Sequence, residues 1–204
     1  MPNFVIYAAT GQILRTGSCP DDHVSIQAQT GEFVMVGVVN NSAQYVDATA
    51  TPPALISYPT QQDRYHTWDW PTKSWILPST ALVQAQSDQA AILNAACQNA
   101  IYAGAQSSAL GSPHTYPAKN LDQSNLIASV TASLYPGLPS TWTTPFWCMD
   151  ANGVWAYVMH TAAQIQQVGA DAKAVIVANL NKNAALQANV RAAVDIPSVQ
   201  AVVW

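Results

Sequence analysis

The segment after Thr161 constrains the fold more than any other, because it predicts a single helix of unusual length. Thr161 and Gln164 have the spacing of a capping box, in which each side chain bonds the backbone N–H of the other residue. The helix that this box opens extends from Ala162 to about Ala193, or about 50 Å at ~1.5 Å per residue. Since globular helices are usually shorter, this one could bend over a sheet, break near Asn181 or pack against copies of itself.

An apolar stripe follows one side of this predicted helix, and Asn179 and Asn183 lie close to it. Buried asparagines can fix the register of packed helices, as they do in coiled coils. Packing against another copy of the chain is therefore one hypothesis for the helix, and packing over the chain's own sheet is another. The residues that would form the helix interface are Ile165, Val168, Ala172, Val175, Ile176 and Leu180.

Two further helices and a hairpin are predicted earlier in the chain. The first helix is capped by Ser79 or Thr80, and its apolar face includes Ile92. Asp122 is predicted to cap the second helix. The segment "FWCMDANGVWAYVM" indicates a β-hairpin, because Asn-Gly favours a tight turn. We therefore expect residues 79–204 to form a module of three helices interleaved with two β-hairpins.

Residues 1–78 predict a β-rich module of short hairpins. Phe4–Tyr7 and Gln12–Thr16 have the composition of strands, and Gly11 lies in the turn between them. "EFVMVGVV" predicts a third strand and "AQYVDAT" a fourth, whereas "TPPALISYPTQQ" is interpreted as a linker or edge passage because of its prolines. Together the two modules predict an α+β protein.

The stretch "TWDWPTKSWIL" places three tryptophans around one tight turn. Trp68 and Trp70 share a face, and Trp75 returns near them across the hairpin, so the rings can contact one another. A hairpin this short is marginal alone, and one interpretation is that the rings clamp it. The other is that they form an aromatic surface on which a sugar stacks. Trp142 and Trp147 are further candidates for such a surface.

The charge content limits the kinds of binding partner that the chain can have. Only 9% of the residues are charged, against about 25% in ordinary domains, so we expect much of the surface to be covered in an assembly; a tolerated polar surface is the alternative. A net charge of -4 with seven Lys plus Arg gives no basic stripe for nucleic acid. No signal sequence and no apolar run near the ~20 residues of a membrane span are visible. We expect a cytosolic origin and no membrane contact.

The residue patterns predict no enzyme. There is no HExxH, GxSxG, P-loop or GxGxxG motif, and Glu32 is the only glutamate, so paired catalytic carboxylates cannot be nominated. The three cysteines lack a CxxC spacing, and we expect inert thiols rather than disulfides or a zinc site. No metal and no cofactor are expected. The scattered histidines and cysteines are His23, His66, His114, His160, Cys19, Cys97 and Cys148.

Several of these motifs together resemble a known family. The segment from about Leu82 to Ala193 contains "YPAKNLDQSN", "FWCMDANGVWAYVM" and "HTAAQIQQVGADAKAVIVANL". It resembles a domain of unknown function that recurs at the C-terminal end of tail-fibre and tail-fibre-assembly proteins of tailed bacteriophages. "FVIYAATGQILRTGSCP" and "WDWPTKSWI" are similar to the N-terminal and linker portions of such proteins. The resemblance implies a non-enzymatic role in the phage tail and supplies no catalytic residues.

The residues and the resemblance lead to the same expected function. The chain is expected to be a structural component of a phage tail, made in the host cytoplasm and located in the virion tail, in contact with tail-fibre or baseplate proteins. A homo-oligomer is expected as well. One alternative is a tail-fibre assembly chaperone that is absent from the mature virion. The other is a receptor- or glycan-binding module that uses exposed tryptophans, either Trp68, Trp70 and Trp75 or Trp142 and Trp147.

Overall fold

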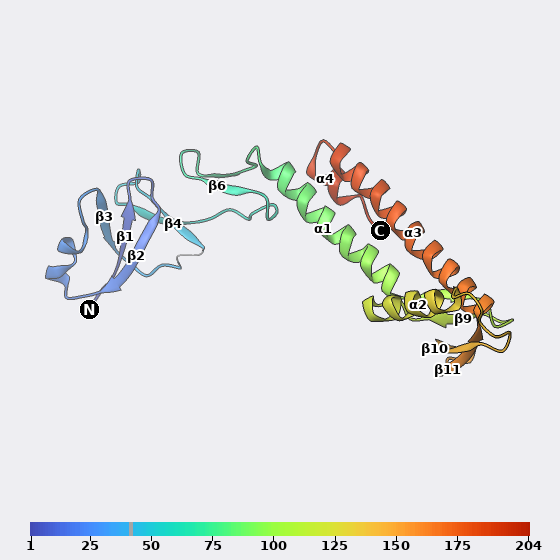
Figure 1. Cartoon of the computed structure of the whole chain (residues 1–204). Coiled ribbons are helices and arrows are strands. Elements are labelled where there is room, and N and C mark those ends of the chain that lie inside the picture. Colours follow the sequence, from blue (N-terminus) through green and yellow to red (C-terminus); the bar gives the residue numbers. More distant parts are fainter. Residues whose placement is uncertain (41–42) are drawn as a thin grey trace. The chain divides into compact units, whose positions relative to one another are not determined.

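The computed structural model describes residues 1–40 and 43–204 and contains two compact units, Met1–Ala81 and Leu82–Trp204 (Figure 1). Each unit is described by itself. The N-terminal unit is built from small sheets, and the C-terminal unit combines helices with one sheet. The predicted α+β class is therefore confirmed, and the division between the units lies close to the boundary expected after residue 78.

The first sheet of the N-terminal unit has its most apolar strand in the middle. Its strand order is β2-β1-β3, and both neighbours pair with β1 in antiparallel fashion. Phe4 and Ile6 pack with Val24 on one face of β1, and Val5 and Tyr7 are buried on the other face. The run "FVIY" is continuous rather than alternating because both faces of the strand are covered. The elements are β1 (Asn3–Ala8), β2 (Ile13–Ser18), β3 (Glu32–Val36) and two 3-10 turns at Asp21–His23 and Ser25–Gln27.

Two short hairpins complete the N-terminal unit. β4 (Gln44–Asp47) pairs with β5 (Ala54–Ser57), and Val46 of β4 packs on the Val5 face of the first sheet. Of the two interpretations of "TPPALISYPTQQ", the linker is wrong and the edge passage is right, because β5 is an edge strand of this two-stranded sheet. Prolines flank the segment, but the residues between them are free to pair. β6 (Thr67–Asp69) and β7 (Ser74–Ile76) form the predicted tryptophan hairpin.

The C-terminal unit contains one antiparallel sheet of four strands in the order β11-β10-β9-β8. The predicted hairpin is present, and its two strands keep one register from Thr143 opposite Thr161 to Met149 opposite Trp155. The second hairpin, β8 with β9, was not located by the sequence because three-residue polar strands carry little periodic signal. The strands are β8 (Ala105–Ser107), β9 (His114–Tyr116), β10 (Thr143–Met149) and β11 (Trp155–Thr161).

The helices begin close to where their capping residues predict. The capping box of α3 is present, since Thr161 N–H donates to Gln164 Oε1 (2.8 Å) and Gln164 N–H donates to Thr161 Oγ1 (3.4 Å). Asp122 is not the N-cap of α2 but lies inside its first turn, where it accepts from the Lys119 N–H (3.1 Å). The helices are α1 (Ala81–Tyr102), α2 (Asn120–Ser133), the unbroken α3 (Ala162–Ala192) and the unpredicted short α4 (Ile196–Gln200).

The apolar core of the C-terminal unit lies between the sheet, α2 and the first half of α3. Ile165 and Val168 of α3 are completely enclosed, and burial of each such side chain contributes about 1.5–3 kcal/mol. Gly169 lets α2 approach closely, since a Cβ there would lie 2.8 Å from a methyl carbon of Val130. The buried core residues are Ala105, Tyr116, Leu126, Phe146, Cys148, Ile165, Val168 and Ala172.

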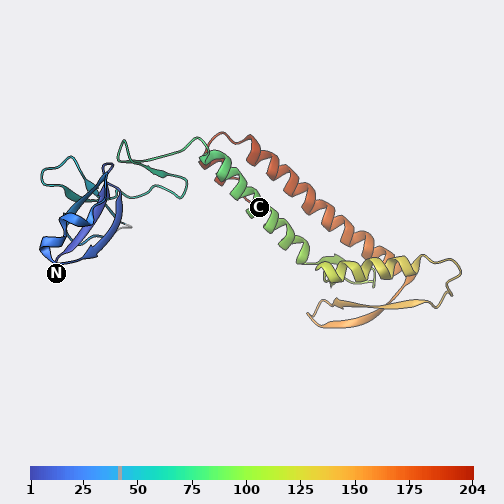
Figure 2. The same ribbon diagram turned by 60° about the vertical axis from the view of Figure 1, so that its left-hand side comes forward.

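The second half of α3 runs antiparallel beside α1, and the two helices are joined by amide side chains (Figures 1 and 2). Asn94 Oδ1 of α1 accepts from Asn183 Nδ2 (2.8 Å) and from Gln187 Nε2 (3.1 Å) of α3. Leu93 of α1 is buried and Ile92 is exposed, so Ile92 does not belong to the buried face of this helix. Asn183 therefore bonds α1 of its own chain, whereas Asn179 Nδ2 donates to the Val175 carbonyl of its own helix at 3.0 Å.

Candidate interaction surface on the C-terminal hairpin

The outer face of the β10–β11 hairpin carries the main exposed aromatic group of the C-terminal unit. Side chains alternate between the two faces of a strand, so Phe146, Cys148 and His160 point into the core while their neighbours point out. We call the outward set the outer aromatic face. It consists of Trp147 and Trp155, each 39% exposed, with Met159 at 53% and Tyr157 at 73%.

The rings of the outer aromatic face contact one another but leave their surfaces open. Trp147 and Trp155 lie nearly parallel, with an interplanar angle of 15° and ring centres 6.1 Å apart. Tyr157 stands directly opposite Trp147 in the strand register, with ring centres 4.9 Å apart. Cross-strand aromatic pairs stabilise a hairpin by up to about 1 kcal/mol each. These contacts still leave a large part of the apolar ring surface exposed to solvent.

The inner face of the same hairpin holds a buried polar pair. His160 Nδ1 lies 2.8 Å from the Val158 carbonyl oxygen, which can only accept, so Nδ1 carries the proton. Nε2 then accepts a hydrogen bond from the Tyr116 hydroxyl at 2.8 Å. Burial lowers the pKa of His160 and raises the pKa of Tyr116 and that of the Cys148 thiol. All three groups are therefore held neutral inside the core, which suits a structural role rather than proton transfer.

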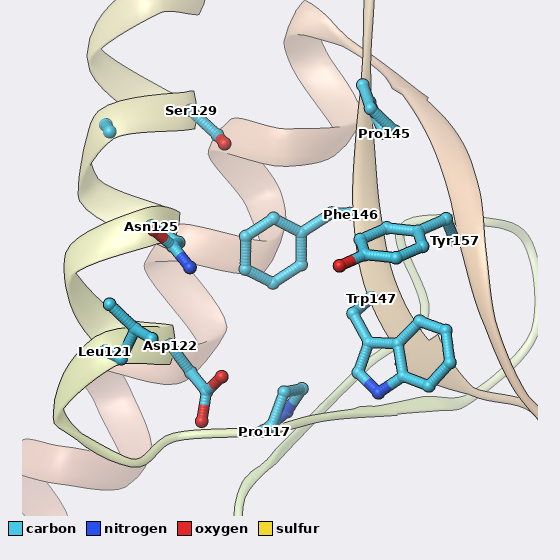
Figure 3. A pocket seen from close by; sticks show the side chains of 10 residues that line it. Pro117, Leu121, Asp122, Asn125, Ser129, Pro145, Phe146, Trp147 and Tyr157 are labelled. Carbon is cyan, nitrogen blue, oxygen red and sulfur yellow. The ribbon is translucent and has the colours of Figure 1, made fainter.

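A groove opens between α2 and β10, beside the outer aromatic face (Figure 3). Its volume is about 520 Å³. Asn125 and Ser129 of α2 point toward the hairpin, and the Phe146 ring lies between the helix and the strand. Asp122 is the one charged side chain of the lining, and its carboxylate already accepts from the Lys119 N–H. The lining residues are Pro117, Leu121, Asp122, Asn125, Ala128, Ser129, Pro145, Phe146, Trp147 and Tyr157.

The tryptophans of the N-terminal unit are packed differently. Trp68 and Trp75 are direct partners in the β6–β7 register, and their rings meet at 72° with centres 5.4 Å apart. Trp68 also contacts Trp70 at 84°, again with an edge toward a face. Two tyrosines complete the group, so that Trp68 contacts four rings. We call this group the N-terminal aromatic cluster; its members are Tyr45, Tyr58, Trp68, Trp70 and Trp75.

A lysine closes one side of the N-terminal aromatic cluster. Lys73 lies in the turn at a φ of 52° and places its ammonium 4.9 Å from the Trp70 ring centre and 5.4 Å from that of Tyr45. Within residues 1–40 and 43–204, the buried Lys73 Nζ has no hydrogen-bond partner, so the ring faces and the charge of the Asp47 carboxylate provide its electrostatic support. Trp75 Nε1 donates to the Pro59 carbonyl at 2.7 Å, which ties the hairpin to the preceding segment.

The structure separates the candidate residues chosen from the sequence. Trp142 is half-buried and packs against the C-terminal core, so it lies apart from the exposed surface to which Trp147 belongs. In the proposed helix interface, Ile165, Val168 and Ala172 are buried in the chain's own core. They are not free for another copy, because the helix folds over the sheet that precedes it. Val175 packs on the same core, Ile176 is half-buried, and Leu180 is exposed.

Trp155, Tyr157 and Met159 were missed as surface residues by the sequence reasoning. The signal that could have found them is the period-two alternation of "WAYVMH", in which the outward positions are all large and apolar. A solvated strand face normally carries polar residues at these positions. Apolar residues on both faces could therefore have marked the outer face as a candidate interaction surface.

The described residues contain no cluster of metal ligands, and Glu32 is engaged by Arg15. Among residues 1–40 and 43–204, no three His, Cys, Asp or Glu side chains gather where they could hold a metal ion. Glu32 is bound by Arg15 through both carboxylate oxygens at 2.6 Å, and this hydrogen bonding lowers the pKa of Glu32. In the same part of the chain, none of the helices has both the length and the hydropathy needed to cross a membrane.

The C-terminal unit is an α+β domain whose four-stranded sheet packs against helices on its inner face and exposes aromatic side chains on the β10–β11 outer face. A family described as a domain of unknown function, DUF4376, matches residues 84–203, which is more than half of the chain. The chain belongs to this family. No curated protein and no solved structure matches it.

Proposed function

We propose that the chain is a non-catalytic component of a bacteriophage tail, associated with the tail fibre or tail tip. In this proposal it is made in the host cytoplasm, is incorporated into the virion tail, and acts through contacts with tail-fibre or baseplate proteins and with copies of itself. The motifs from Leu82 to Ala193 support the link to phage tails through their resemblance to that class of protein.

The outer aromatic face is the observation that carries the proposed role in protein contacts. Aromatic residues and Met are enriched at the centres of protein interfaces, and a contiguous exposed apolar patch on a soluble domain usually marks such a site. The charge content of 9% points the same way, because a surface with few charges opposes association weakly. Contacts between copies would use this face rather than the α3 stripe, whose Ile165, Val168 and Ala172 are already enclosed.

Quantitative mass spectrometry of purified virions tests the proposal. We expect the chain in the particles at a fixed ratio to the fibre protein, and we expect Tyr157→Lys to lower its incorporation. Val83→Lys, at an exposed position of α1, is the matched control and should be incorporated normally. Absence of the wild-type chain from particles would contradict the proposal. Absence combined with misfolded fibres in a deletion mutant would identify the chain as an assembly chaperone instead.

A second candidate function, a receptor- or glycan-binding module, is favoured by the Trp147–Trp155 pair. Its two rings are nearly parallel and open to solvent, and the adjacent groove offers the Asn125 amide and the Ser129 hydroxyl. Apolar ring surface combined with a few polar groups is typical of small-molecule sites. Binding of the purified chain to a glycan array, lost in Trp155→Ala, would support this function. An array without any bound glycan would exclude it for the glycans present.

A further inference from the structure

The strand β10 is paired along its whole length on one side but only at one end on the other. All seven of its residues face β11. On the opposite side, within the described residues, the single paired position is Met149 with Thr115 of β9. The chain then leaves the sheet at Pro117 and enters α2, so no strand of the described part of the chain accompanies β10 from Thr143 to Trp147.

The hairpin register shows which backbone groups this open edge presents. Asp150 N–H donates to the Val154 carbonyl at 3.0 Å, and bonded and non-bonded pairs alternate from there along an antiparallel ladder. Cys148, Phe146 and Thr144 therefore direct their backbone groups toward β11. Thr143, Pro145 and Trp147 direct theirs away from β11, and of these three residues Pro145 and Trp147 line the groove. Pro145, which has no N–H to donate, sits in a non-bonded pair with Met159, as this alternation requires.

The groove described above lies along this open edge. β10 forms one wall, and α2 forms the other with Asn125, Ala128 and Ser129 (Figure 3). An extended chain advances ~3.3 Å per residue, so the edge from Thr143 to Trp147 matches an extended segment of about five residues. α2 forms the far wall, so the open edge of β10 faces a groove.

We propose that the groove binds an extended segment of a partner polypeptide, which adds to the sheet as a strand beside β10. Backbone hydrogen bonds to Thr143, Pro145 and Trp147 would hold the segment, and alternate side chains would meet Phe146 and Tyr157 or the polar side of α2. The partner is a different polypeptide, because this chain is itself acidic, with a net charge of -4, and the groove carries the carboxylate of Asp122. The Asp122 carboxylate disfavours acidic residues in the segment and favours neutral or basic ones.

This inference rests on the proposed role in protein contacts and names the way one such contact is made. The probe is a library of short random peptides selected on the purified full chain. We expect selected peptides that lack acidic residues and that shift the amide resonances of Thr143 and Trp147. N-methylation at every second peptide position can begin at the first or at the second residue, which gives two methylation phases. One phase should abolish binding and the other should leave it intact, because only every second N–H of an added strand faces β10.

A blocking variant keeps the test independent of the selected sequence. Ala128 is exposed on α2 and lines the groove, so Ala128→Trp fills the groove without disturbing the core and should weaken peptide binding by at least about tenfold. Ser124→Trp, at an exposed position of α2 outside the lining, is the matched control and should bind normally.

Three outcomes would overturn the inference: no selected peptide binds, both methylation phases bind equally, or Ala128→Trp binds as the control does. If one of them occurs while the chain is present in purified virions, the strand-addition inference fails and the proposed function stands. If peptides bind in the groove but virions lack the chain, the proposed function fails and the site stands.

Discussion

The two groups of aromatic residues in this chain have similar composition and opposite packing. In the N-terminal aromatic cluster, Trp68 contacts four other rings, mostly edge to face, and Lys73 covers one side. On the outer aromatic face, Trp155 has one ring partner among the described residues, Trp147, and Tyr157 is 73% exposed. The first group uses its apolar area within the unit, and the second leaves it available to another molecule.

This difference shows that tryptophan content alone does not identify a binding surface. The stretch "TWDWPTKSWIL" attracts attention in the sequence because its three tryptophans are close together, yet in the structure the rings pack on each other. The packing favours the clamp interpretation over a stacking surface. The outer aromatic face draws on two strands of a hairpin, so its members are separated by a turn in the sequence and meet only when the strands pair.

The largest expected effect is that of Trp68→Ala on the stability of the N-terminal unit. Loss of a ring with four aromatic neighbours should lower the free energy of unfolding by about 3 kcal/mol. Hydrogen exchange of the Val5 and Ile6 amides in the buried strand β1 measures this change. If Trp68→Ala lowered the free energy of unfolding of the N-terminal unit by less than Trp155→Ala lowers that of the C-terminal unit, the comparison between the two aromatic groups would be reversed.

The inner face of the β10–β11 hairpin should respond to pH. Burial holds the pKa of His160 below its ordinary value of 6.5, so the unfolded chain binds more protons between the folded and unfolded pKa values. The stability of the C-terminal unit is therefore complete above about pH 6.5 and falls as the pH decreases through this window, by at most ~1.4 kcal/mol per pH unit.

Denaturant unfolding at several pH values between neutral pH and about pH 5 measures how steeply the stability depends on pH. His160→Gln, which does not titrate, should remove it. The aspartates whose pKa values are lowered, such as Asp150 and Asp195, lose their contribution only at lower pH, below their ordinary value of 3.8. A flat wild-type profile in the upper window would show that His160 is not shielded from water.

Lys73→Met tests the cation in the N-terminal aromatic cluster. The substitution keeps an unbranched side chain, one heavy atom shorter, and removes the charge that lies over Trp70 and Tyr45. We expect a loss of about 1 kcal/mol. Thermal unfolding of the variant provides the measurement. An increase in stability would show that the burial of the ammonium costs more than its ring contacts return.

The smallest expected effect on stability is that of Trp155→Ala. Its ring is 39% exposed and has one aromatic partner, so the free energy of unfolding should change by less than about 1 kcal/mol. The same variant should weaken association with the partner or with other copies, which analytical ultracentrifugation and virion incorporation measure. A large loss of stability with normal association would assign the outer aromatic face a purely structural role.

Local signals predicted most of the fold. The Thr161–Gln164 capping box gave the start of α3, and the Asn-Gly turn gave the β10–β11 hairpin. The errors arose where tertiary contacts determine which segments pair as strands and which helix face is buried. The strand at Ala54–Ser57 forms because β4 is available to pair with it, and α1 buries Leu93 rather than Ile92 because α3 and the C-terminal segment lie on that side.

The candidate surface was less accessible to sequence reasoning than the fold. Trp147 was nominated, but its neighbours Trp155 and Tyr157 were not, because a cross-strand pair depends on a register that becomes visible only in the folded hairpin. The α3 stripe was assigned correctly as apolar. Which surface it meets, the chain's own sheet or another copy, cannot be read from periodicity, since both give the same pattern along the helix.

Hydroxyl-radical footprinting of the free chain and of purified virions tests the central claim most directly. The claim is that the outer aromatic face is covered in the assembly while the N-terminal aromatic cluster is already closed. We predict strong oxidation of Trp155 and Tyr157 in the free chain, protection of both in virions, and no change at Trp68. Equal oxidation of Trp155 and Tyr157 in the two samples would contradict the account.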